Sequence, residues 1–200
     1  MRSFATASLL LGAATHVAAQ YYNQSAPFNL VLKSVNETLD GKYLTPCHSG
    51  AAIENLCVYD TPSAYPYFYN YSDTPDFTSD SGYLTWDLHG GNFVVNEPMV
   101  FSYNPSSNLA LPQLQPGYGE LLIAFDEDEK LYVPAYIDDS VDPIEAGESF
   151  PLYRWFACQT YYSAYRYLAL SWQLGNAPPQ NPTCQAVNVT RVFTETAGGY

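Results

Sequence analysis

Tyrosine is the residue type whose spacing in this chain best fits a binding chemistry. The sequence holds 19 tyrosines. An aromatic ring presents a flat apolar face with a polar edge, and such a surface suits the C–H face of a sugar ring. The structural alternative is that the rings fill core volume, because tyrosine is common in strands. Two short segments supply our eight candidate carbohydrate contacts: Tyr65, Tyr67, Tyr69 and Tyr71, then Tyr161, Tyr162, Tyr165 and Tyr167.

Acidic side chains suggest a second chemistry, the hydrolysis of a glycosidic bond. That reaction needs two carboxyl groups at a suitable separation, and the chain holds 20 acidic residues. One group of such a pair stays protonated, which an apolar or aromatic environment favours. Asp87, next to Trp86, and Glu97, before Pro98, are the acids least typical of turns. The sequence does not nominate a pair, so we assign no catalytic residue.

Motifs for metals, cofactors and nucleophilic catalysis are missing from the sequence. The acidic run 126–129 lacks the glycine and the distant glutamate of an EF-hand loop, so we expect a solvated turn there. Zinc prefers closely spaced Cys and His pairs, and only Cys47 and His48 lie together. There is no G-x-S-x-G segment and no glycine-rich phosphate loop. We therefore predict no metal and no cofactor, and we favour a protein that is not an enzyme.

The first 19 residues are typical of a secretory signal peptide. Arg2 provides a positive start, residues 9–11 begin a short apolar stretch, and small residues at 17–19 precede a cleavage site before Gln20. This pattern predicts a secreted protein that consists of residues 20–200. Residues 194–200 lack the apolar tail of a GPI signal, so we expect no membrane anchor.

Cysteines and asparagines fit an oxidising, glycosylating compartment. Four cysteines predict two disulfide bonds, with three pairings open. We favour Cys47–Cys57 and Cys158–Cys184, because each pair closes a local loop. Four asparagines stand in N-x-S/T triplets and are predicted glycosylation sites on exposed positions. They are Asn23, Asn36, Asn70 and Asn188.

The formal net charge of −13 excludes several partners. Nucleic-acid binding requires a basic surface that neutralises phosphates, and an anionic membrane surface repels an acidic protein in the same way. We expect neither partner. Only 14 % of the residues are charged, whereas 16 % are aromatic, and this composition is typical of a folded chain.

Periodicity predicts strands throughout the chain. Residues 28–35 alternate between apolar and polar side chains, as do residues 185–193. Residues 121–125 and 131–137 flank a charged turn and read as a hairpin. Residues 51–56 could form one helical turn, but no stretch of 12 residues shows helical periodicity.

We therefore predict an all-β fold with one compact domain over residues 20–200. The architecture is an antiparallel β-barrel or β-sandwich, with a β-trefoil as one form it could take. Residues 84–90 and 170–175 share a Leu-x-Trp-x-Leu pattern, which we interpret as two core strands rather than a repeat. The predicted core consists of Phe28, Leu30, Leu32, Leu84, Trp86, Ile123, Phe125, Trp155, Leu170, Trp172 and Val189.

Several segments together resemble a group of small secreted ascomycete proteins of unknown function. These segments are residues 27–33, 43–52, 101–108 and 170–184. The last third is also similar to fungal phialide-type cell-wall proteins, through Trp155, Cys158, Trp172 and Cys184. The resemblance implies a fungal extracellular or wall-associated protein with a local Cys158–Cys184 bond. It brings no catalytic residues.

The function we expect is that of a non-catalytic secreted fungal glycoprotein. It would be associated with the cell wall or extracellular matrix and would contact wall polysaccharide through surface tyrosines. Two alternatives remain open at this stage: a glycoside-active enzyme that uses a carboxylate pair, and a secreted effector or antigen that binds a host protein. The oligomeric state is not predicted.

Overall fold

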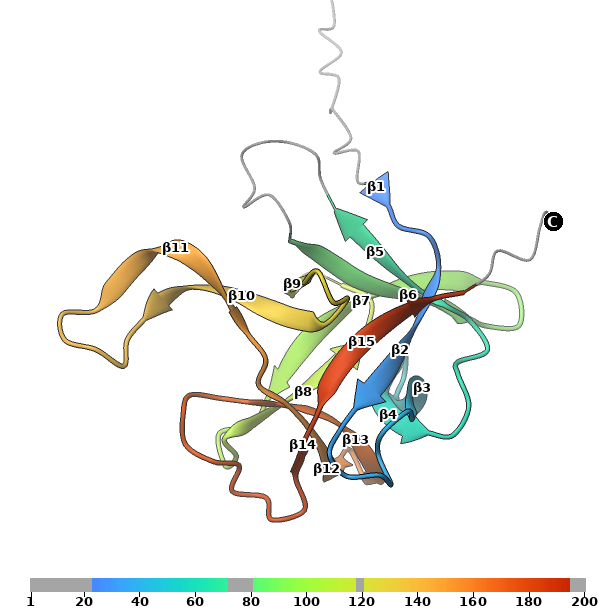
Figure 1. The fold of residues 1–200 in the computed structure, drawn as a ribbon. Helices are drawn as coiled ribbons and strands as arrows, with labels where there is room; N and C mark the ends of the chain where they lie inside the picture. Colours follow the sequence, from blue (N-terminus) through green and yellow to red (C-terminus); the bar gives the residue numbers. More distant parts are fainter. Residues whose placement is uncertain (1–22, 72–80, 118–120, 195–200) are drawn as a thin grey trace, which may run out of the picture.

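The chain forms a closed antiparallel β-barrel with additional strands outside the barrel wall (Figure 1). The computed structural model describes residues 23–71, 81–117 and 121–194, and no helix occurs in these ranges. The predicted signal peptide and the acidic patch at Asp73, Asp76 and Asp80 lie outside the described residues. The all-β prediction is therefore confirmed.

Fifteen strands are described. They are β1 (Asn23–Gln24), β2 (Phe28–Lys33), β3 (Tyr43–Gly50), β4 (Ile53–Tyr59), β5 (Tyr67–Tyr71), β6 (Gly82–His89), β7 (Val94–Tyr103), β8 (Leu109–Leu114), β9 (Leu122–Phe125), β10 (Leu131–Asp138), β11 (Glu145–Leu152), β12 (Trp155–Tyr162), β13 (Tyr165–Gln173), β14 (Gln185–Ala186) and β15 (Asn188–Phe193).

Eight of these strands close the barrel in the order β2, β3, β4, β13, β8, β7, β6 and β5. The ring closes where Phe28 of β2 pairs with Tyr67 of β5. A closed ring has no free edge, so the barrel form of the prediction is the one that the structure adopts. Eight strands do not divide into three equal repeats, which agrees with reading the two Leu-Trp-Leu segments as core strands. Those segments lie in β6 and β13, which are not neighbours in the ring.

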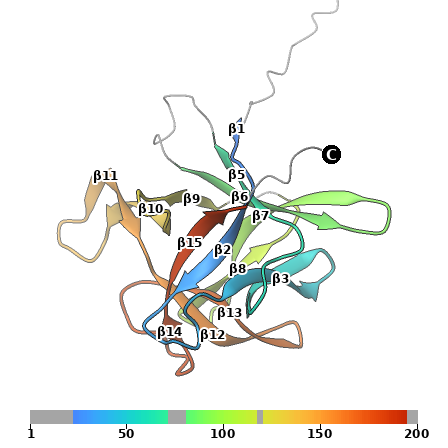
Figure 2. The same ribbon diagram turned by 45° about the vertical axis from the view of Figure 1, so that its right-hand side comes forward.

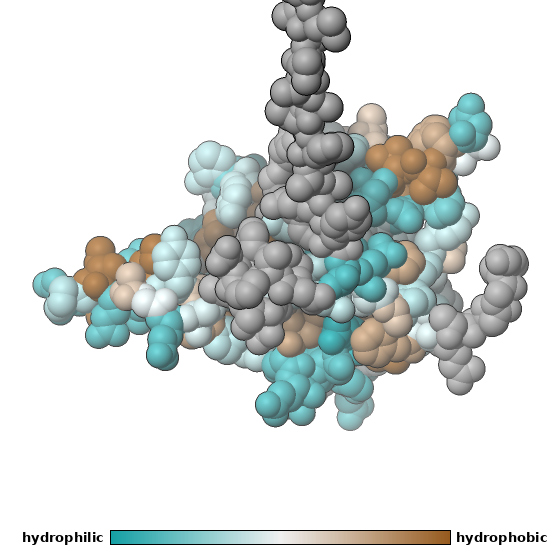
Figure 3. Space-filling view, turned by 90° about the horizontal axis from the view of Figure 1, so that it is seen from above, coloured by the Kyte–Doolittle hydropathy of each residue, from teal (hydrophilic) through white to brown (hydrophobic). Residues whose placement is uncertain are grey.

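The remaining strands extend the barrel wall. In Figures 1 and 2, β15 lies beside β2, and the two pair over six positions. β12 pairs with β13, and β14 pairs with β12. The predicted hairpin at residues 121–137 is present as β9 and β10, with its charged turn at the tip. β10 continues with β11 as an arm that projects away from the barrel, and exposed apolar side chains of this arm lie among hydrophilic ones at the left of Figure 3.

Inward-facing residues of the ring strands fill the barrel with apolar side chains. Ten of the eleven predicted core residues are buried, and the prediction is confirmed for them. The exception, Phe125, is half-buried because it packs against the core while the Arg191 guanidinium lies over its outer face. The deeper interior also contains residues that were not predicted, among them Leu56, Met99, Leu114 and Leu131.

The prediction of a helical turn at residues 51–56 is wrong. Ala51 and Ala52 form the turn between β3 and β4, and Ala52 has a positive φ of 52°. From Ile53 the chain is extended, and Leu56 points into the barrel core. A short segment rich in alanine has some helical propensity, but strand pairing with β3 and burial of alternate residues determine its conformation.

Both favoured disulfide bonds are confirmed. Cys47 pairs with Cys57 across the β3–β4 hairpin, and Cys158 pairs with Cys184. The second bond joins β12 to the loop that precedes β14, so a long connection after β13 is attached to the barrel wall.

Candidate functional site

A pocket of about 390 Å³ lies between the β7–β8 connection and the β12–β13 hairpin. The described residues that line it include no acidic or basic side chain, although the chain as a whole carries a net charge of −13. Eight of them are polar and uncharged, three are tyrosines and two are leucines. They are Ser102, Asn104, Ser106, Ser107, Gln159, Thr160, Ser171 and Asn181, then Tyr103, Tyr161 and Tyr162, then Leu109 and Leu111.

Two exposed tyrosine rings flank this pocket. Tyr103 ends β7 and is 63 % exposed, and Tyr161 lies near the end of β12 and is 65 % exposed. The Arg166 guanidinium lies 5.4 Å from the centroid of the Tyr161 ring, a cation–π contact that holds the ring in place. The rings therefore offer apolar surface next to a polar pocket.

Ser171 lies in the wall of the same pocket with its hydroxyl covered by neighbouring groups. Its side chain is fully buried, and its Oγ has no hydrogen-bond partner among the described residues. A buried hydroxyl without a partner is unfavourable by about 1–3 kcal/mol.

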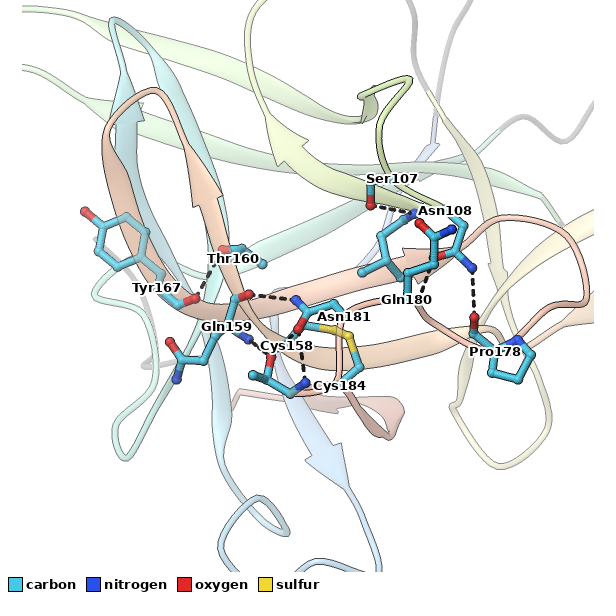
Figure 4. The surroundings of a disulfide bond; sticks show 12 residues. Ser107, Asn108, Cys158, Gln159, Thr160, Tyr167, Pro178, Gln180, Asn181 and Cys184 are labelled. Carbon is cyan, nitrogen blue, oxygen red and sulfur yellow. Dashed lines mark hydrogen bonds between the residues drawn. A yellow bond between two sulfur atoms is a disulfide. The ribbon is translucent and has the colours of Figure 1, made fainter.

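The loop beside the pocket is held by a side-chain network at the Cys158–Cys184 bond (Figure 4). Asn181 Nδ2 donates to the Gln159 carbonyl oxygen at 2.8 Å, and Thr183 Oγ1 accepts from the Gln159 N–H at 2.9 Å. Asn108 Oδ1 accepts from the Gln180 N–H at 2.9 Å. These bonds connect the loop to both β12 and the start of β8, so the walls of the pocket are fixed relative to each other.

The opposite wall is a turn built around Asn104. Its Oδ1 accepts hydrogen bonds from the N–H and the hydroxyl of Ser106, at 3.0 and 2.8 Å. This is an Asx-type turn, which asparagine favours because its side chain substitutes for a backbone acceptor. Asn104 and Asn181 are each followed by proline, so neither belongs to a glycosylation triplet. Their side chains are therefore available for structural and binding roles.

The first tyrosine segment does not form a binding surface. Tyr67 is fully buried with its hydroxyl donating to the Leu44 carbonyl oxygen at 3.0 Å, and Tyr69 is buried with its hydroxyl donating to the Ile123 carbonyl oxygen at 3.2 Å. These two residues are core residues, and their prediction as carbohydrate contacts is wrong. The inward positions of β5 required large apolar side chains, and tyrosine filled them because a backbone acceptor meets each hydroxyl. Tyr71 is half-buried beside Tyr69.

Tyr65 is exposed, but its ring contacts another aromatic ring. Its ring stacks on the ring of His89 with centroids 3.7 Å apart. The stacking covers one face of the Tyr65 ring, so only the other face is free among the described residues.

The second tyrosine segment contributes to two different surfaces. Tyr161 and the half-buried Tyr162 line the pocket, and they remain candidate contacts. Tyr165 and Tyr167 are half-buried with nearly parallel rings, 6.0 Å apart between centroids. Tyr167 donates its hydroxyl hydrogen to the His48 carbonyl oxygen at 2.8 Å. Burial is the main cause that raises the pKa of the Tyr167 hydroxyl.

A buried carboxyl pair lies inside the barrel, away from the pocket. Glu97 of β7 is 0 % exposed and Glu54 of β4 is 5 % exposed. Burial raises the pKa of Glu97 to about 9, with further contributions from a side-chain hydrogen bond and charge repulsion with Glu54. Glu97 is therefore protonated at neutral pH.

This pair does not suit glycosidic-bond cleavage. A sugar cannot reach two carboxyl groups that side chains cover almost completely, and hydrolysis requires direct contact with the substrate. Asp87, the other acid considered from the sequence, is half-buried on β6 and accepts a hydrogen bond from Asn96 Nδ2 at 2.8 Å. The apolar surroundings that favour a protonated carboxyl are present at Glu97, but they are those of the barrel core.

The predicted glycosylation sites differ in accessibility. Asn23 and Asn188 are exposed, whereas Asn36 and Asn70 are half-buried. Asn70 Nδ2, the atom that a glycan would modify, donates to Thr85 Oγ1 at 3.3 Å. Asn23 and Asn188 are thus the positions where an attached glycan would cause the least rearrangement.

Sequence reasoning missed Tyr103, the polar pocket wall and Glu54. Tyr103 stands directly before an Asn-Pro turn, and a tyrosine at the end of a strand is a signal for an exposed ring. Glu54 was not identified because residues 51–56 were expected to form a helical turn. Only in a strand do the side chains of Glu54 and Leu56 point to the same face.

The described ranges contain neither a metal-binding cluster nor a membrane-spanning helix. No group of three or more His, Cys, Asp or Glu side chains in these ranges is arranged to hold a metal ion. None of the described residues forms a helix that could span a membrane.

Comparison with known proteins gives one match. A family model described as a domain of unknown function (DUF7907) matches residues 25–193, which include the whole barrel and the pocket. No curated protein and no solved structure matches the chain.

Proposed function

We propose that this chain, which belongs to the DUF7907 family, is a secreted protein that binds neutral polysaccharide without cleaving it. The binding site in this proposal is the uncharged pocket between the β7–β8 connection and the β12–β13 hairpin. Tyr103 and Tyr161 would stack against sugar rings, and the polar wall would bind hydroxyl groups.

The observation that carries the proposal is the absence of charge among the described residues that line the pocket. Acidic residues are 20 of the 200 residues, so about one carboxylate would be expected among the lining residues if they were drawn at random. A ligand with many hydroxyls and no charge matches amide and hydroxyl partners together with aromatic faces. A lining without carboxyl groups also supports binding rather than hydrolysis, because hydrolysis uses a carboxyl pair.

The setting we propose is extracellular and fungal. It is supported by the signal-peptide pattern of residues 1–19, by two disulfide bonds and by four glycosylation triplets. The resemblance to small secreted ascomycete proteins and to phialide-type wall proteins adds the cell wall as the place of action. Sequencing the secreted protein tests the first step, since the mature chain should begin at Gln20 and carry a glycan on Asn23.

Retention on insoluble polysaccharide tests the binding step. The full secreted protein is mixed with chitin, β-glucan and mannan, and the bound fraction is measured. We expect retention on at least one of the three, reduced about 5- to 30-fold by Tyr161→Ala, which corresponds to about 1–2 kcal/mol.

The matched control is Tyr136→Ala. Tyr136 is 63 % exposed on the projecting arm, so the substitution removes an equally exposed ring at a distant position. Retention on none of the polysaccharides, or an equal loss in the control, would contradict the proposal.

A further inference from the structure

A second pocket, separate from the uncharged one, contains basic residues in a strongly acidic protein. It has a volume of about 560 Å³ and is lined by residues from the end of β2, the start of β15, β12 and β14. Lys33, the last residue of β2, and Arg154, directly before β12, both line it. Its size is within the usual range of small-molecule sites.

Three of the six described basic side chains pair with a carboxylate, and neither Lys33 nor Arg154 is among them. Lys42 pairs with Asp60, Lys130 with Asp128, and Arg191 with Glu129. Arg166 lies over the Tyr161 ring. Among the described residues, Lys33 and Arg154 are in contact with no carboxylate, despite the large excess of acidic residues in the chain.

Arg154 is held in place at the pocket. Its Nη2 donates to Asn176 Oδ1 at 2.6 Å, and its carbonyl oxygen accepts from the Gln173 N–H at 2.9 Å. Hydrogen bonds from Ser140 lower the pKa of Asp138, and the positive charge of Arg154 lowers this pKa further. The guanidinium is thus fixed, charged and available to a ligand.

One carboxylate, Asp40, also lines the pocket. Its Oδ1 accepts a hydrogen bond from the Ser34 N–H at 3.1 Å. Two cations and one carboxylate leave one net positive charge, which matches a monoanion better than a phosphate carrying nearly two negative charges at neutral pH. Arginine binds a planar carboxylate through two parallel N–H groups.

The rest of the wall suits a ligand with a ring-sized body. Tyr153 and Phe156 contribute aromatic surface, Val187 contributes apolar surface, and the half-buried Gln173 contributes an amide. We infer that this pocket binds a small carboxylate-bearing sugar acid, with Arg154 and Lys33 on the carboxylate and the aromatic residues on the ring. This site is independent of the uncharged pocket and of the function proposed for it.

Titration of the full protein with glucuronate and galacturonate at pH 7 and low ionic strength tests the site. Glucose and inorganic phosphate serve as the neutral and the phosphate probes. We expect saturable binding of at least one uronate, no binding of glucose, and weaker binding of phosphate. Arg154→Gln should weaken uronate binding about tenfold or more, and Lys33→Gln severalfold.

The matched control is Lys130→Gln, which changes the net charge by the same amount at a residue that pairs with Asp128 and lines neither pocket. Its affinity for uronate should equal that of the unmodified protein. Because Arg154 also holds Asn176, thermal unfolding is measured for each variant; if Arg154→Gln does not fold, the exposed Lys33→Gln carries the comparison. The inference is overturned by the absence of saturable uronate binding, by tighter binding of phosphate, or by an equal loss in Lys130→Gln.

Discussion

Replacing Glu97 by glutamine should make the protein less sensitive to rising pH. The pKa of Glu97 is about 9 in the folded chain, compared with an ordinary value of 4.5, because the carboxyl is buried and next to Glu54. Between these two values the folded state holds a proton that the unfolded state has released. Stability therefore falls as pH rises from about 5 to about 9. Below pH 4.5 the carboxyl is protonated in both the folded and the unfolded state, so this loss of stability is absent there.

The size of this loss of stability follows from the shift in the pKa of Glu97. One pKa unit corresponds to about 1.4 kcal/mol, so the interval from pH 4.5 to pH 7 costs the native protein at most about 3 kcal/mol. Relaxation of the surroundings reduces this figure, and we expect about 1–3 kcal/mol. Glutamine has a similar shape, does not ionise and can still donate a hydrogen bond to Glu54.

Urea unfolding at one-unit steps from pH 4 to pH 9, with the disulfides intact, measures the effect. The difference in unfolding free energy between Glu97→Gln and the native protein should shift in favour of the variant as pH rises. Asp87→Asn makes the same chemical change at a half-buried carboxyl on the neighbouring strand and should show no comparable trend. A difference that stays constant from pH 4 to pH 9 would refute the reasoning.

Two further predictions concern the framework around the sites. Replacing Cys158 and Cys184 together by serine should lower the unfolding free energy by about 2–4 kcal/mol and increase amide hydrogen exchange in residues 174–184, since the bond attaches that loop to β12; unchanged exchange in the loop would argue against that role. Gly82→Ala should destabilise the protein by about 1–3 kcal/mol in urea unfolding, because the new methyl group would overlap the Asn70 carbonyl oxygen across the β5–β6 pair. Gly91→Ala is its control, with no described atom within 4 Å of the new group, and an equal effect at both positions would contradict the packing argument.

The strand framework was predictable because the barrel imposes a period of two on its strands. Phe28, Leu30 and Leu32 alternate clearly, and the hairpin around residues 126–130 has strands on both sides of a charged turn. The local disulfide pairing followed in the same way, since each bond closes a short loop. The closure of the ring was not predictable, because it depends on long-range pairs such as Phe28 with Tyr67.

The tyrosines were harder to interpret, because composition does not distinguish a buried ring from an exposed one. Tyr67 and Tyr161 both lie in tyrosine-rich strands, but one is fully buried and the other is 65 % exposed. Their difference arises from position within each strand: Tyr67 lies on the inward face of a ring strand, whereas Tyr161 lies near the hairpin end of β12, whose first residue, Trp155, is buried in the core. The uncharged pocket combines residues from segments about 60 positions apart, so only the folded chain brings them together.

The proposed function depends most directly on whether the uncharged pocket, which Tyr103 and Tyr161 flank, binds sugar. The decisive measurement is calorimetric titration with a soluble oligosaccharide of the polysaccharide that retains the protein, comparing the Tyr103→Ala/Tyr161→Ala double variant with Tyr136→Ala. We predict one binding site per chain, a loss of affinity of at least about 30-fold in the double variant, and unchanged affinity in Tyr136→Ala. Equal affinity of the double variant and the unmodified protein would contradict the proposed site.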